Sequence, residues 1–186
     1  PWANKVPAIL NMFLTGQAGG SAVCDILFGD VNPSGKLSET YPLALEDNSS
    51  YNYFPGTPVS VEYREGVYVG YKYYDTAKKE VAFPFGFGLS YTTFEYSDIK
   101  VSADSIKDTD TVTVSFKIKN TGSVDGAEVA QVYVNDVEST IYRPVKELRG
   151  FKKVFLKAGE EKEVSITLDK RAFAYYNVNI GDWHVE

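Results

Sequence analysis

The second half of the chain alternates apolar and polar residues, and this period of two constrains the fold more than any other feature. Over residues 111–119 every second residue is apolar, from Val112 to Ile118, and threonine, serine and lysine lie between them. Residues 162–168 repeat the pattern. Strands that alternate in this way bury only one face, so a second layer must cover each of them. The pattern predicts an all-β domain of two layers.

Six candidate strands follow one another through this part of the chain. They span residues 94–101, 111–119, 128–136, 146–156, 162–168 and 173–180, and turn-forming residues such as Asn120-Thr-Gly122 separate them. Short strands at this spacing predict a β-sandwich over residues 91–186. A sandwich of seven strands requires one more strand beyond Glu186, so we expect this domain to lack its last strand.

The first 42 residues carry a different pattern, which predicts part of an α/β domain. Residues 8–14 are an apolar run of the length of a strand buried on both faces of a parallel sheet. Residues 19–29 place apolar side chains on one helical face, with Ser21 as the expected N-cap and Gly29 as the left-handed residue that ends the helix. One strand and one helix cannot cover both their faces, so residues 1–42 are expected to be the remnant of a larger domain.

A turn and a short strand are expected to complete this remnant. Asn32-Pro-Ser-Gly35 has the residues of a tight turn, because proline presets φ and glycine accepts the positive φ that closes the turn. Residues 37–41 then alternate like a strand, which Pro42 is expected to stop. The single cysteine, Cys24, lies on the predicted helix beside Ile26 and is expected to be a small core residue.

Residues 43–90 are predicted to be a linker with extended and irregular aromatic-rich segments. Residues 67–71 alternate as a strand would, so we expect a paired extended segment there. Residues 83–89 alternate aromatic residues with glycine and proline, which prevents regular strand pairing. This segment is expected to be ordered but irregular and to cross an aromatic-lined interface. Asn48-Ser-Ser50 matches the N-glycosylation pattern, which also occurs often by chance.

Four blocks of sequence, in the same order along the chain, resemble glycoside hydrolase family 3, the β-glucosidase-like enzymes. The blocks are Asp25-Ile-Leu-Phe-Gly-Asp-Val-Asn-Pro-Ser-Gly-Lys-Leu37, Glu65-Gly-Val-Tyr-Val-Gly-Tyr-Lys-Tyr-Tyr-Asp75, Phe83-Pro-Phe-Gly-Phe-Gly-Leu-Ser-Tyr-Thr-Thr-Phe94 and Arg143-Pro-Val-Lys-Glu-Leu-Arg-Gly-Phe-Lys-Lys-Val-Phe-Leu156. The resemblance implies the end of the α/β sandwich domain followed by a fibronectin type III-like domain. It covers essentially the whole chain.

The resemblance implies that the catalytic carboxylates lie in segments of the enzyme outside this chain. A retaining glycosidase needs two carboxyl groups about 5–5.5 Å apart. In the family the nucleophilic aspartate lies in a barrel domain, and the acid/base glutamate precedes the strand expected at residues 8–14. We therefore assign no catalytic, substrate-binding or metal-binding residue to this chain, and no cofactor. The expected partners are the barrel domain and the rest of the α/β domain, and the expected substrate of the intact protein is a β-glucoside or short oligosaccharide.

Other local groups of polar residues are interpreted as structural rather than as catalytic or metal-binding sites. The carboxylate pairs Glu62 with Glu65 and Asp25 with Asp30 are better explained as exposed charge or capping groups than as catalytic pairs. With one histidine and one cysteine, a His/Cys zinc site is excluded by counting. His184 is expected to be an edge-strand residue beside Trp183. Four aspartates could in principle gather a calcium ion at one end of the sandwich, but their spacing lacks the EF-hand pattern. We expect them to be solvated turn residues: Asp104, Asp108, Asp110 and Asp136.

Charge and composition leave one alternative class of function open. The net charge is −6, which disfavours nucleic acid as a partner, and no apolar run approaches the ~20 residues that span a bilayer. The cellular location stays open. Because 15% of the residues are aromatic, a stand-alone carbohydrate-binding or adhesion module is the alternative to a scaffold portion of an enzyme. A flat row of exposed aromatic side chains on the sandwich favours binding, whereas aromatic residues packed between the domains favour the scaffold.

Overall fold

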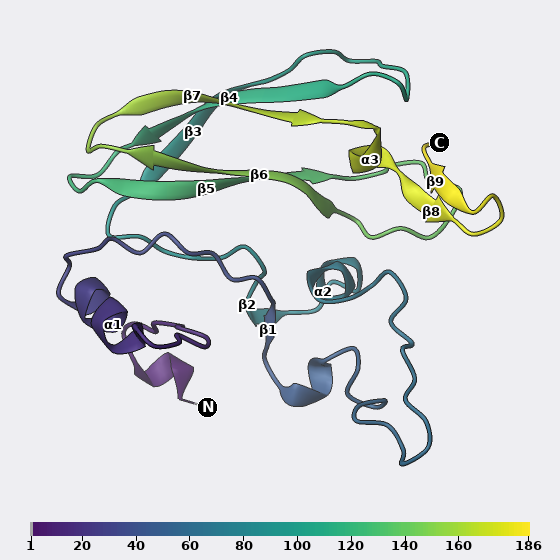
Figure 1. The fold of residues 1–186 in the computed structure, drawn as a ribbon, viewed down its shortest axis with the longest axis horizontal. Coiled ribbons are helices and arrows are strands. Elements are labelled where there is room, and N and C mark those ends of the chain that lie inside the picture. The colour runs from purple at the N-terminus through teal and green to yellow at the C-terminus, as the bar shows by residue number, and fades with distance from the viewer. Residues whose placement is uncertain (1) are drawn as a thin grey trace.

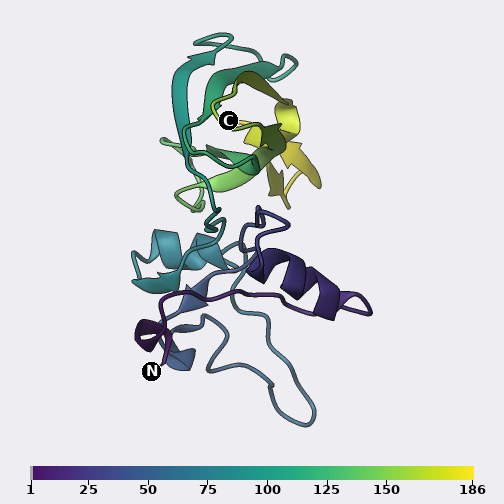
Figure 2. The same cartoon turned by 90° about the vertical axis from the view of Figure 1, so that its left-hand side faces the viewer.

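The computed structural model describes residues 2–186 and shows a β-sandwich stacked on a less regular N-terminal part (Figures 1 and 2). The N-terminal part contains few regular elements. They are η1 (Ala3–Lys5), α1 (Gly19–Leu27), β1 (Tyr41–Pro42), η2 (Leu45–Asp47), α2 (Tyr71–Thr76) and β2 (Val81–Phe83). β1 and β2 pair antiparallel, and backbone hydrogen bonds join Leu37 to Gly86 and Phe87 beyond this ladder.

The sandwich consists of two antiparallel sheets. One sheet has the order β3-β4-β7 and the other pairs β5 with β6. Their bounds are β3 (Phe94–Val101), β4 (Val112–Asn120), β5 (Gly126–Val134), β6 (Glu147–Leu156) and β7 (Glu161–Leu168). These five strands confirm the predicted ones to within two residues at each end.

The sixth predicted strand, over residues 173–180, is wrong as a single element. The short helix α3 (Lys170–Phe173) comes first, and a small hairpin of β8 (Tyr175–Asn177) and β9 (Asp182–His184) follows. Asp169 caps α3 by accepting a hydrogen bond from the backbone amide of Arg171 at 3.0 Å. Because Val178-Asn-Ile-Gly181 turns back on itself, the predicted run divides into one strand and a turn.

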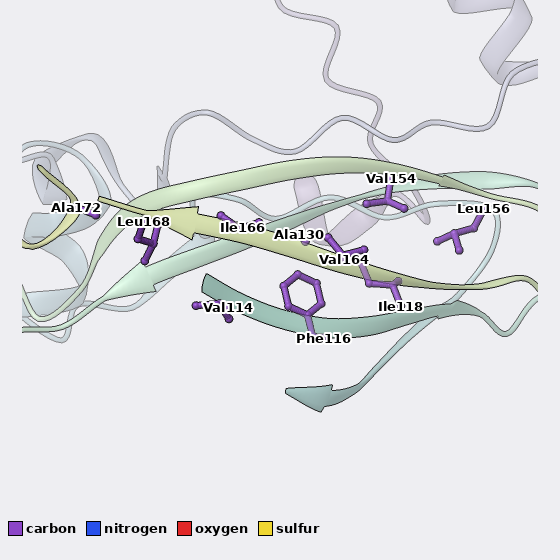
Figure 3. Packing of buried hydrophobic residues seen from close by; sticks show 10 residues of the cluster. All are labelled: Val114, Phe116, Ile118, Ala130, Val154, Leu156, Val164, Ile166, Leu168 and Ala172. Carbon is purple, nitrogen blue, oxygen red and sulfur yellow. The ribbon is translucent and has the colours of Figure 1, made fainter. Parts of the chain in front are cut away.

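The core lies between the two sheets and follows the alternation in the sequence (Figure 3). Every second side chain of β4 and β7 points into it, and β5 and β6 supply the facing layer. Ile118 and Leu156 are fully buried, as is Asn120, whose amide donates to the carbonyl oxygen of Val124 at 2.8 Å and accepts from Thr92 Oγ1 at 2.6 Å. A buried amide with its hydrogen bonds satisfied is tolerated in an apolar core.

The strand predicted over residues 8–14 is wrong in this chain. The segment forms no strand and pairs with none in residues 2–186, Phe13 has φ +46°, and the side chain of Leu14 is fully exposed. A parallel strand forms only when a neighbour exchanges backbone hydrogen bonds with it, and an apolar sequence does not supply that neighbour.

The predicted helix forms, with different details at its start and along its face. It begins at Gly19 with Ala18 as the N-cap residue, so the predicted Ser21 cap is wrong; Ser21 Oγ instead donates to the carbonyl oxygen of Ala18 at 3.0 Å. Gly29 has φ +85°, which confirms the left-handed residue after the helix. Cys24 is exposed, so its assignment to the core is wrong, because Gly19 is the one buried residue of α1.

Two predictions for the middle of the chain are also wrong. Tyr71–Thr76 forms α2 rather than the end of an extended segment, since Tyr71 and Tyr74 are one helical turn apart and both turn inward. The strand expected over residues 37–41 shrinks to Tyr41–Pro42 and includes the proline meant to end it. The prediction for residues 83–89 is confirmed: after β2 the chain is irregular and its phenylalanines pack against other rings.

Within residues 2–186, no helix combines the length and the apolar composition that crossing a bilayer requires.

We expect the amide protons of α1 to exchange with solvent much faster than those of β4. A helix of nine residues is marginal alone, and α1 buries almost nothing, whereas β4 is paired on both sides. Hydrogen–deuterium exchange measured residue by residue tests this expectation. Protection of residues 22–27 at the level of residues 114–118 would show that α1 is held by contacts far stronger than those it makes here.

Candidate functional site

The candidate site is the contact between the two parts of the chain, where side-chain hydrogen bonds, ion pairs and aromatic contacts gather. We call this contact the seam. In the seam, residues 32–37 and 71–91 contact the strands β5 and β6 and the loops beside them. At one end the side chain of Asn32 makes three hydrogen bonds. Its Oδ1 accepts from Ser90 Oγ and from the amide of Tyr91, both at 2.8 Å, and its Nδ2 donates to the carbonyl oxygen of Asp125 at 2.9 Å. One amide therefore joins three segments of the chain.

Lys36 continues the seam next to Asn32. Its Nζ donates to the carbonyl oxygen of Gly88 at 2.8 Å and lies 3.0 Å from Oε2 of Glu128 on β5. The other carboxylate oxygen of Glu128 accepts from the hydroxyl of Tyr96 at 3.1 Å. Burial, together with the charge of Glu128, raises the pKa of Tyr96 far above its ordinary value, so this tyrosine stays a neutral donor.

Aromatic rings fill the middle of the seam. Tyr71 of α2 stacks on Phe85 with 4.5 Å between the ring centroids and meets Tyr133 of β5 edge to face at 6.0 Å. The Tyr71 hydroxyl accepts a hydrogen bond of 2.7 Å from the amide of Leu148. Burial raises the pKa of Tyr133 to about 12, so its hydroxyl is a neutral donor to Gln131 Oε1 at 2.6 Å.

Gln131 joins this cluster to the irregular segment that follows β2. Its Nε2 donates to the carbonyl oxygen of Gly86 at 3.1 Å. The φ of residue 86 is +78°, a backbone angle that favours glycine. A Cβ atom here would also displace the end of the Gln131 side chain from its hydrogen bond.

A charged cluster closes the other end of the seam around Glu147. Its two carboxylate oxygens contact three cations: Lys72 Nζ at 3.2 Å, and Arg143 Nη2 and Arg149 Nη2 at 2.9 Å each. Burial acts to raise the pKa of Glu147, but the hydrogen bond from Arg143 and the charges of Arg149 and Lys72 outweigh it and hold the pKa below the ordinary value. Lys72 belongs to α2, so the cluster fixes that helix on the sandwich.

The carboxylates considered from sequence as catalytic pairs have separate surroundings. Glu62 forms an ion pair with Arg64 at the surface, whereas Glu65 accepts a hydrogen bond from Ser49 Oγ. Asp25 lies on the exposed helix α1, and its backbone carbonyl oxygen accepts from the amide of Val31 at 3.0 Å.

The residues considered from sequence for metal binding make separate contacts with different partners. Asp108 forms an ion pair with Lys170 at 2.8 Å, which lowers the pKa of Asp108, and Asp136 forms one with Arg143 at 2.9 Å. Asp110 accepts from the amide of Lys107 in a turn. His184 lies on β9 beside Trp183, as expected. Across residues 2–186, no three His, Cys, Asp or Glu side chains gather closely enough to hold a metal ion.

Asn48, the expected acceptor of the glycosylation pattern, folds its side chain back on the local chain. Its Oδ1 accepts from the amide and the hydroxyl of Ser50, at 3.1 and 2.9 Å. This is the geometry of an Asx turn.

Sequence reasoning missed the residues of the seam. Asn32 was interpreted as a turn residue only, although an asparagine side chain carries both donor and acceptor groups that can link distant segments. No feature of the sequence distinguishes Lys72 and Glu147 from ordinary surface charges. The one available signal was the resemblance, because most residues of the seam fall in or next to its four blocks, although those from the 125–133 region do not: Asp125, Glu128, Gln131 and Tyr133.

Comparisons with known proteins identify both parts of the chain. Residues 1–91 match the glycosyl hydrolase family 3 C-terminal domain, and residues 128–186 match the fibronectin type III-like domain. The chain is 59% identical over its full length to thermostable beta-glucosidase B of Acetivibrio thermocellus, and 49% identical to exo-alpha-(1->6)-L-arabinopyranosidase of Bifidobacterium longum. It covers 25% and 24% of those two proteins, so the chain spans about a quarter of the length of these relatives.

Solved structures show the same relationship. All of this chain superposes on 27% of the GH3 beta-glucosidase of Bifidobacterium adolescentis with a TM-score of 0.93 and 49% identity, and on 22% of the beta-glucosidase of Kluyveromyces marxianus in complex with glucose with a TM-score of 0.92 and 44% identity. The chain belongs to glycoside hydrolase family 3, of which it is a C-terminal portion. This confirms the resemblance drawn from the four blocks.

We expect Asn32→Ala to lower the free energy of unfolding by about 2–3 kcal/mol, because it removes three hydrogen bonds and leaves partly buried groups unpaired. Urea denaturation followed by circular dichroism measures the loss. The matched control is Asn179→Ala in the exposed β8–β9 turn, which should change the midpoint little. Equal effects of the two substitutions would show that Asn32 does not join the two parts.

The charged cluster predicts a dependence of stability on pH. Because folding lowers the pKa of Glu147, its ionised form stabilises the fold above the ordinary value of 4.5, and this contribution is lost as the pH falls through the lower folded-state value. Glu147→Gln should therefore destabilise the protein by about 2 kcal/mol at pH 7 and flatten the fall in stability below pH ~4.5. Denaturation curves at several pH values test this, with the exposed Glu161→Gln as control. Parallel curves for wild type and Glu147→Gln would contradict the prediction.

Proposed function

We propose that this chain is the non-catalytic C-terminal portion of a retaining β-glucosidase-type glycoside hydrolase. In the intact protein the enzyme removes terminal β-linked sugars, with glucose as the expected sugar. The observation that carries the proposal is the seam. Its polar side chains form hydrogen bonds and ion pairs that join the two parts of the chain, which is a structural role. The names of the relatives support the reaction: the proteins compared are called beta-glucosidases, and one an arabinopyranosidase.

The distribution of carboxylates supports the absence of catalytic residues. Retaining hydrolysis requires two carboxyl groups about 5–5.5 Å apart on either side of the scissile bond. In the seam, Glu128 and Glu147 are neutralised by lysine and arginine, which makes them structural anions. The nucleophile and the acid/base are therefore assigned to the remainder of the enzyme.

The exposed apolar surface of the N-terminal part supports a partner. Large apolar side chains are exposed repeatedly along residues 9–69, whereas proteins that act alone expose large apolar side chains mostly singly. Among them are Leu14, Phe28, Leu45, Phe54, Val59 and Tyr63, each more than half exposed. We assign this surface to contact with the barrel domain and the rest of the α/β domain of the same enzyme.

The alternative, a carbohydrate-binding module, has one specific observation in its favour. Phe151 and Phe155 lie on the same face of β6 and are 70% and 61% exposed, so both rings are open to a ligand from solvent. Against it, the aromatic side chains of Tyr71 and Phe85 pack in the seam, which is the arrangement expected of a scaffold.

One pair of assays tests the scaffold against both catalysis and the alternative. The chain, shown to be folded by a cooperative thermal transition, should release no p-nitrophenol from p-nitrophenyl β-D-glucoside, and it should not be retained by insoluble β-glucan. Turnover that Glu65→Gln abolishes would overturn the assignment of the chemistry to other segments. Retention on β-glucan that Phe151→Ala abolishes, and that the matched Phe54→Ala preserves, would favour the binding module.

A further inference from the structure

A cavity borders the seam beside the start of α2 and shares Tyr71 and Phe85 with it. It has a volume of about 440 Å³, within the range of small-molecule sites. Residues 38–40, which lead into β1, form one wall, and Ser49 and Glu65 from the long loop below form another. The first turn of α2 closes the inner end. In Figure 1 α2 lies next to the β1–β2 pair, with the long loop below it.

The polar groups of this cavity suit a neutral ligand that carries hydroxyl groups. Two carboxylates, Glu39 and Glu65, and the hydroxyls of Ser38 and Thr40 line it, and no lysine, arginine or histidine does. Without a cation the cavity repels anions. With two carboxylates it lacks the third group that would mark a metal site, and no such group of three occurs in residues 2–186. Carboxylates do, however, accept hydrogen bonds from ligand hydroxyls.

The inner wall is aromatic. Tyr71 and Phe85, stacked on each other, line the cavity together with Tyr74 and Val69. A wall of rings facing a set of carboxylate and hydroxyl oxygens matches a ligand with an apolar face and a polar rim. A pyranose ring has this character, because its C–H groups gather on its faces and its hydroxyls point outward.

An unused donor is directed into the same cavity. Tyr74 is 4% exposed and lines the cavity, and among the hydrogen bonds of residues 2–186 none involves its hydroxyl. The hydroxyl oxygen itself keeps some accessible surface, because Arg149 Nε is the one fully buried side-chain nitrogen or oxygen without a partner in residues 2–186. Burial of the residue, followed by the neighbouring Tyr73 and the negative charge of Asp47, raises the pKa of Tyr74, so the group stays protonated. The fold thus presents, at the cavity wall, a donor without a protein partner beside acceptors.

We propose that this cavity binds one monosaccharide in the pyranose form, with Tyr74 donating to a ring hydroxyl, Glu65 and Glu39 accepting from others, and the rings of Tyr71 and Phe85 forming the apolar wall. No bond is made or broken there. The site is a regulatory or stabilising one, because α2 carries both the inner wall and the seam residues Tyr71 and Lys72. It is independent of the proposed function of the chain.

The test is a titration of the folded 186-residue chain with D-glucose, followed by isothermal calorimetry and by amide chemical shifts. Saturable binding should perturb the amides of residues 38–40, 65 and 70–74. Glu65→Gln keeps an acceptor for Ser49 but removes the charge, so it should weaken binding about tenfold, and Tyr74→Phe about threefold or more. The matched controls, Glu62→Gln and Tyr63→Phe on exposed neighbours, should bind as the wild type does. Cyclohexanol, similar in size but with a single hydroxyl, should not bind.

Three results would overturn the proposal. They are a folded chain that shows no saturable binding of glucose, binding that neither substitution weakens, and a crystal structure of the intact enzyme in which another side chain of the protein fills the cavity. If Tyr74→Phe unfolds, Ser38→Ala at the exposed rim serves in its place and should also weaken binding. Loss of catalytic turnover plays no part in these readouts, so a failure here leaves the scaffold proposal standing, and the reverse also holds.

Discussion

The structure depends most on the contacts that the side chain of Tyr71 makes. Its ring stacks on Phe85 and meets Tyr133 edge to face, while its hydroxyl accepts from the amide of Leu148. One residue thereby contacts the irregular segment after β2 and both strands of the β5–β6 sheet. Tyr71 also belongs to α2, a helix of six residues that is too short to be stable alone. The aromatic contact must therefore form for the helix to form, and the helix then places Lys72 beside Glu147.

The β-sandwich was predictable from sequence because its structure follows from a local rule. A strand with apolar residues at every second position has one face to bury, and Val112 to Ile118 bury that face against the second sheet. The N-terminal part obeys no such rule. The apolar run at residues 8–14 needs neighbouring strands to become a strand, and Tyr71 becomes helical because Tyr74 can turn inward with it. These outcomes depend on tertiary contacts, which periodicity in the sequence does not encode.

The seam was invisible to sequence reasoning for a related reason. Lysine, arginine and glutamate are normally surface residues, and exposed ion pairs add little stability. Glu147 differs because two arginines of its own segment, Arg143 and Arg149, and Lys72 of α2 meet it in a half-buried position. Partial burial removes water that would otherwise screen the charges, so each contact becomes stronger and each lost partner more costly. Only the fold brings residue 72 to residues 143 and 147, and the family blocks around them were the one trace of this contact.

The cavity and the seam share α2, and this sharing has a thermodynamic consequence. A ligand that binds only the folded arrangement of residues 70–74 adds its binding free energy to that arrangement. Because Tyr71 and Lys72 also hold the sandwich against the N-terminal part, the same free energy stabilises the contact between the two parts. Coupling between sites is reciprocal, so a rigid seam preorganises the cavity as much as an occupied cavity stiffens the seam. A scaffold portion built in this way couples the binding of a sugar in the cavity to the stability of the seam, although it contains no catalytic residue.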